Sequence, residues 1–177
     1  DYTIGEKVVA NPDGTRALRY MFKPSLDKFQ ATLVDGSITT LGSFDCALPG
    51  GFTNGETLTL AGGAKINRYD SHFTSGVTNH FFYLLAEGAV VPAAFAAKLA
   101  PADLVCNGNT ALAGIGRDKA GKIWYKALTQ YFTSGTTYTQ ARLATLAAAS
   151  DLYGAASTEY QAVAAAWDAV KVTLNIQ

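Results

Sequence analysis

The sequence predicts a mainly α fold of about five helices, preceded by an irregular first part that contains β-hairpins. Two observations support this prediction. Apolar residues recur at helical spacing after residue 70, whereas turn signals concentrate before it, as in NPDG at 11–14, PGG at 49–51 and GG at 62–63. The 177 residues suit one domain with a sizeable core.

The first predicted helix begins near residue 77 and ends at Gly88, because glycine commonly follows a helix end. A short helix is expected at 92–100, where Pro92 stands in the first turn. The apolar face of the first helix comprises Val77, Phe81, Leu84 and Leu85.

Three further helices are predicted at 118–132, about 140–153 and about 158–170. Thr137 and Gln140 form a capping-box pattern before the second of them. The expected buried stripes are Ile123, Ala127 and Tyr131 in the first, Leu143, Leu146 and Ala147 in the second, and Val163, Ala166, Trp167 and Val170 in the third.

The region before residue 70 reads as loops and small hairpins. Short threonine-containing runs with partial alternation, ATLVDGSITTLG and ETLTLAGG, lie between its turn signals.

Composition excludes two classes of partner. Apolar residues make up 49% and charged residues 16%, and 14 basic residues balance 14 acidic ones. No basic run predicts nucleic-acid binding, and no apolar run predicts a membrane span. The chain opens on DYTIGEKVVA, which lacks the features of a signal peptide. We interpret this opening as that of a mature product or of a piece of a longer protein.

Sequence motifs for self-contained chemistry are absent. HExxH, CxxC and GxSxG do not occur, and GIGRDKAG at 114–121 is neither a dinucleotide loop nor a P-loop. His72 and His80 are eight residues apart, which cannot bring both rings to one metal if both are helical. Cys46 and Cys106 form either one disulfide or two buried thiols.

His72 stands just ahead of an apolar helix. The helix dipole there favours a neutral imidazole, which can donate one hydrogen bond to a developing oxyanion. The alternative is an ordinary histidine in a surface loop. His80, next to Phe81, is expected to be a partly exposed packing residue.

Other charged residues allow two interpretations each. Arg19 lies in the apolar stretch ALRYM, where it forms either a structural salt bridge or a fork that binds a substrate carbonyl. Asp1 and Glu6 are close enough in sequence to share a hard cation, although two carboxylates alone make an incomplete site.

Several stretches together resemble the C-terminal half of thermolysin-like zinc metalloendopeptidases. They are DYTIGE, ALRYM, SHFTSGVTNHFFYLLAEG, GIGRDKAGKIWYKALTQYFTSGTTYTQARLATLAAASDLYG and VAAAWDAVKV. The resemblance covers about 1–24 and 70–172 in the family's order. The segment from about Ser25 to Asn67 has no such match and reads as an insertion (25–67) within a single domain, 1–177.

The resemblance implies a role as one wall of an active-site cleft. In this family zinc is bound by HExxH and a further Glu in an N-terminal catalytic domain, so this chain would hold no zinc ligand and would be inactive alone. It implies a peptide or protein substrate, a secreted enzyme and bound calcium. Secretion in turn favours a Cys46–Cys106 disulfide.

The resemblance also assigns roles to residues. His72 matches the His that donates a hydrogen bond to the oxyanion, and Arg19 matches the Arg that binds the substrate carbonyl just past the cleaved bond. Asp1 and Glu6 match two calcium-binding carboxylates.

The chain departs from the family pattern in three respects. Thr74 stands where the family usually has Asn, and Thr3 replaces a calcium-binding Glu. The Asp that orients the family's His has as its candidate here Asp70, at an unusual offset, whereas Asn67 has the usual spacing.

Two other hypotheses are weighed against the enzyme. One is a non-catalytic interaction module that binds a partner through the insertion. The other is a free-standing metal-binding domain, for which this chain has too few ligands.

Overall fold

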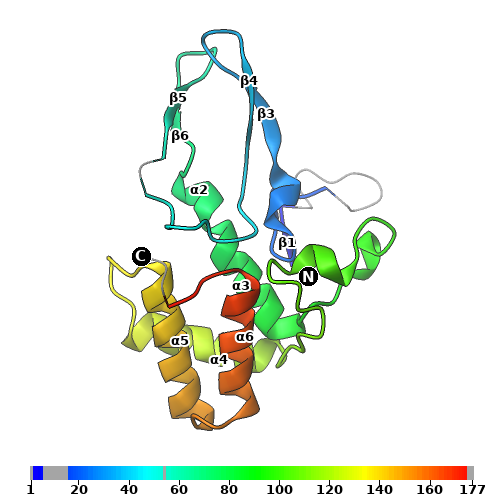
Figure 1. Cartoon of the computed structure of the whole chain (residues 1–177), viewed down its shortest axis with the longest axis vertical. Helices are drawn as coiled ribbons and strands as arrows, with labels where there is room; N and C mark the ends of the chain where they lie inside the picture. Colours follow the sequence, from blue (N-terminus) through cyan, green and yellow to red (C-terminus); the bar gives the residue numbers. More distant parts are fainter. Residues whose placement is uncertain (1, 6–15, 54, 175–177) are drawn as a thin grey trace.

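The computed structural model describes residues 2–5, 16–53 and 55–174. Figure 1 shows two regions: a helical body (residues 71–174) and an arm (residues 24–70, as far as they are described) that extends from one end of it. None of the described helices has the length and apolar content to cross a bilayer.

The helical body confirms the mainly α prediction. A single turn, α2 (Ser71–Thr74), precedes the longer helices. Two short 3₁₀ turns, η2 (Ala93–Phe95) and η3 (Pro101–Leu104), follow the first long helix, α3 (Gly76–Glu87). The other long helices are α4 (Arg117–Gln130), α5 (Tyr138–Tyr153) and α6 (Thr158–Ala169).

The predicted helix ends are set by local chemistry. The Thr137 side chain accepts a hydrogen bond from the backbone N–H of Gln140, and the Gln140 side chain bonds back to Thr137, which confirms the capping box. Gly88 ends α3 at a φ of 77°. A Cβ there would lie 2.3 Å from the Leu112 carbonyl oxygen, so only glycine fits.

The core of the body lies between α3 and the last three helices. Trp167 of α6 stacks on Phe81 of α3 with ring centroids 3.8 Å apart, and its indole N–H donates to the Thr145 hydroxyl of α5. The predicted faces of α3 and α6 are buried throughout and are confirmed: Val77, Phe81, Leu84 and Leu85, with Val163, Ala166, Trp167 and Val170.

Two predicted stripes were wrong in part. Leu143 of α5 is 50% exposed, because α5 packs through small residues that let neighbouring helices approach closely. In α4, Ile123 and Ala127 are buried, but Tyr131 is exposed because the helix ends at Gln130. The buried residues of α5 are Ala141, Arg142, Ala144, Thr145, Ala148 and Ala149.

The helix expected at 92–100 is instead a 3₁₀ turn, η2 (Ala93–Phe95), followed by further turns. Prolines at both ends, Pro92 and Pro101, leave too short a run to nucleate an α-helix. A second 3₁₀ turn, η3 (Pro101–Leu104), follows directly.

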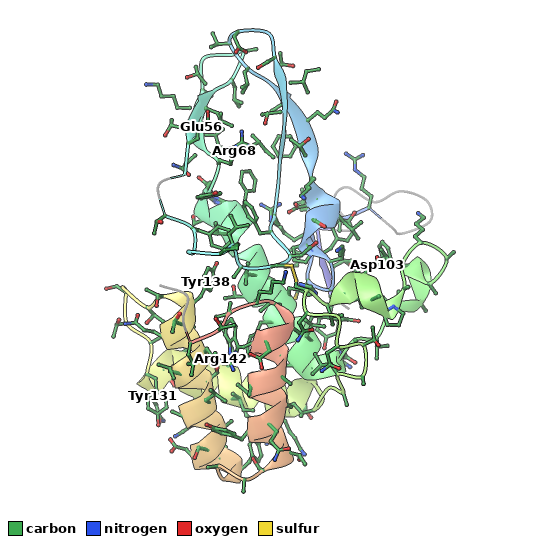
Figure 2. The ribbon with its side chains drawn as sticks, in the orientation of Figure 1. Glu56, Arg68, Asp103, Tyr131, Tyr138 and Arg142 are labelled. Atoms are coloured by element: carbon green, nitrogen blue, oxygen red, sulfur yellow. A yellow bond between two sulfur atoms is a disulfide. The ribbon has the colours of Figure 1, made fainter. Side chains whose placement is uncertain are left out.

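Two antiparallel hairpins make up the arm and confirm the predicted hairpins. In the first, β3 (Phe29–Thr32) pairs with β4 (Ile38–Leu41); in the second, β5 (Thr57–Thr59) pairs with β6 (Lys65–Asn67). A bridge between Leu33 and Leu60 joins the two hairpins. Figure 2 shows Glu56 and Arg68 on the second hairpin, where their side chains lie 3.3 Å apart.

At the foot of the arm, β1 (Thr3–Ile4) pairs with β2 (Arg19–Tyr20), and the 3₁₀ turn η1 (Pro24–Asp27) leads into β3. The arm has only a small apolar cluster of its own, and part of it comes from α2. Its buried members are Leu41, Leu58 and Phe73.

Candidate functional site

A disulfide joins the arm to the body. Cys46 of the arm is bonded to Cys106, 60 residues further along the chain, so the disulfide alternative is the one the structure adopts. Figure 2 shows it near the junction of the two regions. Backbone hydrogen bonds on both sides, from Ala47 to Val170 and from Cys106 to Ala169, fix the two loops against the end of α6.

Asp45, next to this disulfide, binds the start of the arm. Its carboxylate accepts from the backbone N–H and hydroxyl of Ser25 at 2.7 and 2.6 Å, and it lies 2.9 Å from the Lys23 ammonium. Burial alone would raise the pKa of Asp45, but the hydrogen bonds from Lys23 and Ser25 outweigh it and lower that pKa.

His80 corrects a sequence expectation, because it is fully buried rather than partly exposed. Its Nδ1 lies 2.8 Å from the Asp45 carbonyl oxygen. Burial lowers the pKa of His80, which favours the neutral ring. Among the described residues its Nε2 has no hydrogen-bond partner. The acceptor, the Asp45 carbonyl oxygen, lies 35 residues earlier in the chain. The sequence pattern around His80 therefore could not predict this hydrogen bond.

The foot of the arm presses on the first turn of α3. A Cβ placed on Gly76 would lie 2.6 Å from the Phe44 carbonyl oxygen and 2.9 Å from the Ser43 Cβ. The Phe44 N–H also donates to the carbonyl of Phe73, the residue after His72. The segment that bears His72 is thus held between the arm and α3.

His72 lies in α2, one turn ahead of α3, and its side chain is 78% exposed. The Asp70 carboxylate caps α2 by accepting the backbone N–H of His72 at 2.8 Å. The same oxygen lies 2.6 Å from His72 Nδ1. These hydrogen bonds from the His72 backbone and ring lower the pKa of Asp70.

This geometry constrains what the His72 ring can donate. Nδ1 must carry a proton to donate to the Asp70 carboxylate, so a neutral ring has a bare, accepting Nε2. A hydrogen bond from Nε2 to a substrate therefore needs the doubly protonated ring. The sequence interpretation, in which the neutral ring is the donor, does not fit an Asp70 carboxylate at Nδ1.

Asn67 has the usual spacing of the residue that orients the His, but its side chain does not contact His72 in a hydrogen bond. Its side chain donates to the Gly55 carbonyl and accepts from the Tyr69 N–H, so it shapes the turn that leads to α2. Thr74, which replaces the family's Asn, ends α2, and its carbonyl accepts from the Tyr138 hydroxyl at 2.6 Å.

Arg19 lies in β2 with its guanidinium partly exposed. Its Nη1 donates to the Leu18 carbonyl and lies 3.2 Å from the Asp27 carboxylate. Asp27 also accepts from the backbone N–H and hydroxyl of Ser43. No described acceptor binds Arg19 Nη2 or Nε, which leaves donors for a further partner.

Sequence reasoning missed both carboxylates that organise the junction, Asp27 and Asp45. Each binds a serine through its backbone N–H and hydroxyl together, and each also lies near a basic residue. The partners are separated by 16 and 20 residues, so no local motif signals them.

The proposed calcium carboxylates, Asp1 and Glu6, lie outside the described residues. Thr3, between them, pairs with Tyr20 in the β1–β2 ladder. Within residues 2–5, 16–53 and 55–174, no three His, Cys, Asp or Glu side chains come together as a metal site. The described donors therefore do not fit a zinc ion: both cysteines are bonded to each other, and each histidine has a different partner.

The helical body carries an exposed His72–Asp70 pair, and Arg19 lines the same hollow as Phe73, the residue after His72. A family model described as the thermolysin metallopeptidase α-helical domain matches residues 1–172, so the chain belongs to this family.

Relatives with assigned names are proteases. Over 97% of its length the chain is 38% identical to a transglutaminase-activating metalloprotease from Streptomyces mobaraensis, and it covers 18% of that protein. It is 42% identical to a bacillolysin from Bacillus cereus and 39% identical to a thermolysin from Alicyclobacillus acidocaldarius, each over 57% of the chain. The chain thus spans less than a fifth of the length of these relatives.

Proposed function

We propose that this chain is the C-terminal domain of a secreted zinc metalloendopeptidase and forms one wall of its active-site cleft. An N-terminal domain of the same polypeptide would hold the zinc, and the isolated chain would be inactive. Asp1 and Glu6 would contribute to a calcium site. The name of the Streptomyces relative refers to activation of another protein, which supports a peptide or protein substrate here as well.

The observation that carries the proposal is the exposed His72 ring with Asp70 on its Nδ1. In the doubly protonated state, His72 Nε2 donates a hydrogen bond to the oxygen that becomes negative when water attacks the peptide carbonyl. Asp70 orients the ring and stabilises its positive charge. Arg19, through donors that no described residue uses, binds the carbonyl just past the cleaved bond.

The enzyme hypothesis is tested first by the coding sequence upstream of Asp1 and then by peptide hydrolysis. We expect that sequence to encode HExxH and a later Glu-bearing helix. We also expect the full-length protein to cleave a peptide before a bulky apolar residue and to lose that activity on chelation. An upstream frame without HExxH, or hydrolysis that chelators leave unchanged, contradicts the proposal; the first result favours the non-catalytic interaction module.

A further inference from the structure

A hollow of about 430 Å³ lies at the foot of the arm, between β2 and the start of β3. This foot is the blue ribbon between β1 and β3 in Figure 1. Arg19 of β2 lines one part of the hollow, and Phe73, the residue after His72, lines another. Arg19 therefore borders the hollow directly, and His72 borders it through its chain neighbour Phe73.

The arm supplies a wall that contains apolar and basic side chains. Leu26, Lys28 and Phe29 all line the hollow, and all three are exposed. The Phe29 ring packs against Phe73 with centroids 6.3 Å apart. These residues belong to the segment 25–67, which we interpret as an insertion. They therefore add binding surface to that of the rest of the domain.

The charge balance of the hollow is positive. Asp27 is its one carboxylate among the described lining residues, and its side chain is only 3% exposed. Arg19 and Ser43 neutralise and solvate that carboxylate. Arg16 and Lys28 are both exposed, and neither forms an ion pair with a described residue. The side chains of Arg16 and Lys28 thus remain available to bind an anion beside the apolar side chains of the hollow.

We propose that this hollow binds an acidic residue of the substrate, two to four residues after the cleaved bond, with Lys28 as the main cationic contact. The inference rests on the proposed function, because Arg19 would hold the first carbonyl past that bond. An extended peptide advances about 3.3 Å per residue, so the chain beyond Arg19 passes over the hollow within a few residues. Phe29 and Leu26 contact the aliphatic part of that segment.

The test uses the full-length protein and peptide pairs that differ only by Glu or Gln at the second, third or fourth position after the cleaved bond. At one position kcat/KM is expected to be about three to five times higher for Glu at low salt, as for an exposed ion pair. High salt reduces this preference because it screens exposed charges. Lys28→Gln removes it, and Phe29→Ala lowers kcat/KM for both peptides of a pair alike.

Lys65→Gln is the matched control, because Lys65 is also an exposed lysine but lies on β6 and does not line the hollow. This variant keeps the preference for Glu. The inference is overturned if the unmodified protein does not distinguish Glu from Gln at any of the three positions. It is also overturned if Lys28→Gln retains the full preference.

Failure of the proposed function gives a different result. If the full-length protein cleaves none of the peptides, binding of a fluorescently labelled Glu peptide is measured by anisotropy instead. Binding that weakens in Lys28→Gln but not in Lys65→Gln supports the acidic-peptide site without peptidase activity. Absence of such binding overturns the inference.

Discussion

The helical body and the arm are held in their conformations by different means. The body buries large apolar side chains from α3, α4 and α6 against the small residues of α5, and Trp167 by itself contacts both α3 and α5. The small apolar cluster of the arm consists of Leu41 and Leu58 together with Phe73 from α2. A disulfide attaches the arm to the body, and two carboxylates, Asp27 and Asp45, bind serines within the arm and basic residues just before it. Apolar packing thus stabilises the body, whereas the arm combines a few apolar contacts at its base with a disulfide and buried carboxylate hydrogen bonds.

The largest effect is expected in the core of the body. Trp167→Ala removes the stack on Phe81 and leaves the Thr145 hydroxyl without its donor, so the free energy of unfolding should fall by about 3–5 kcal/mol. Leu58→Ala in the arm should lower it by about 2 kcal/mol, because the surrounding cluster is small. Urea unfolding of both variants tests this order, and an equal or larger loss in Leu58→Ala would break the comparison.

Loss of the disulfide comes next. A cross-link between residues 60 apart restricts the unfolded chain, and its removal by Cys46→Ala with Cys106→Ala should destabilise the protein by about 2–4 kcal/mol. Because the bond attaches the arm, limited proteolysis should cut within residues 24–70 before it cuts the helices. Simultaneous cleavage of both regions would show that the arm does not depend on this link more than the body does.

Gly76→Ala addresses the contact between arm and α3. In a helix interior alanine is more stable than glycine by about 1 kcal/mol, and this gain is smaller at Gly76, which is the first residue of α3. Here its Cβ would meet the backbone oxygen of Phe44, so we expect a net loss of about 1–2 kcal/mol in thermal or urea unfolding. Gly121→Ala in α4 is the control, because a Cβ there has nothing within 4 Å and should stabilise. A stabilising Gly76→Ala would mean that the arm does not press on α3.

The smallest effect concerns His80 and pH. Burial lowers its pKa in the folded state, so the unfolded state binds the proton more readily. The free energy of unfolding should therefore fall as pH drops below about 6.5, by at most about 1.4 kcal/mol per pH unit. Asp45 and Asp70, whose pKa values are lowered, act only at more acidic pH. His80→Gln should remove the slope between pH 6.5 and 5; an unchanged slope would contradict the assignment.

Hydrophobic periodicity predicted the body where large apolar residues recur at helical spacing. The large apolar residues assigned to the buried faces of α3 and α6 are buried, so both faces were predicted correctly. In α5 the buried side is mainly alanine, and the large Leu143 faces solvent. The pattern there gives the wrong face because residue size, rather than hydrophobicity, decides close helix packing.

The candidate site was predictable only in part. The resemblance proposed His72 and Arg19 as site residues, and local sequence made Asp70 a candidate because it is two residues from His72. The sequence did not indicate Asp27 and Asp45 as site residues, because each lies far in sequence from its serine partner. The state of the His72 ring also could not be predicted, since it depends on which nitrogen the Asp70 carboxylate contacts.

The most direct test of the proposed catalytic role is the kcat of the full-length protein after His72→Ala. The exposed His72 side chain contributes little to packing, so the variant should fold normally. Loss of one oxyanion donor should lower kcat by about 10²–10³-fold with little change in KM. Ser71→Ala, the neighbouring exposed position in α2, should leave kcat unchanged. A His72→Ala protein that folds and hydrolyses peptides at the original rate would contradict the role proposed for this residue.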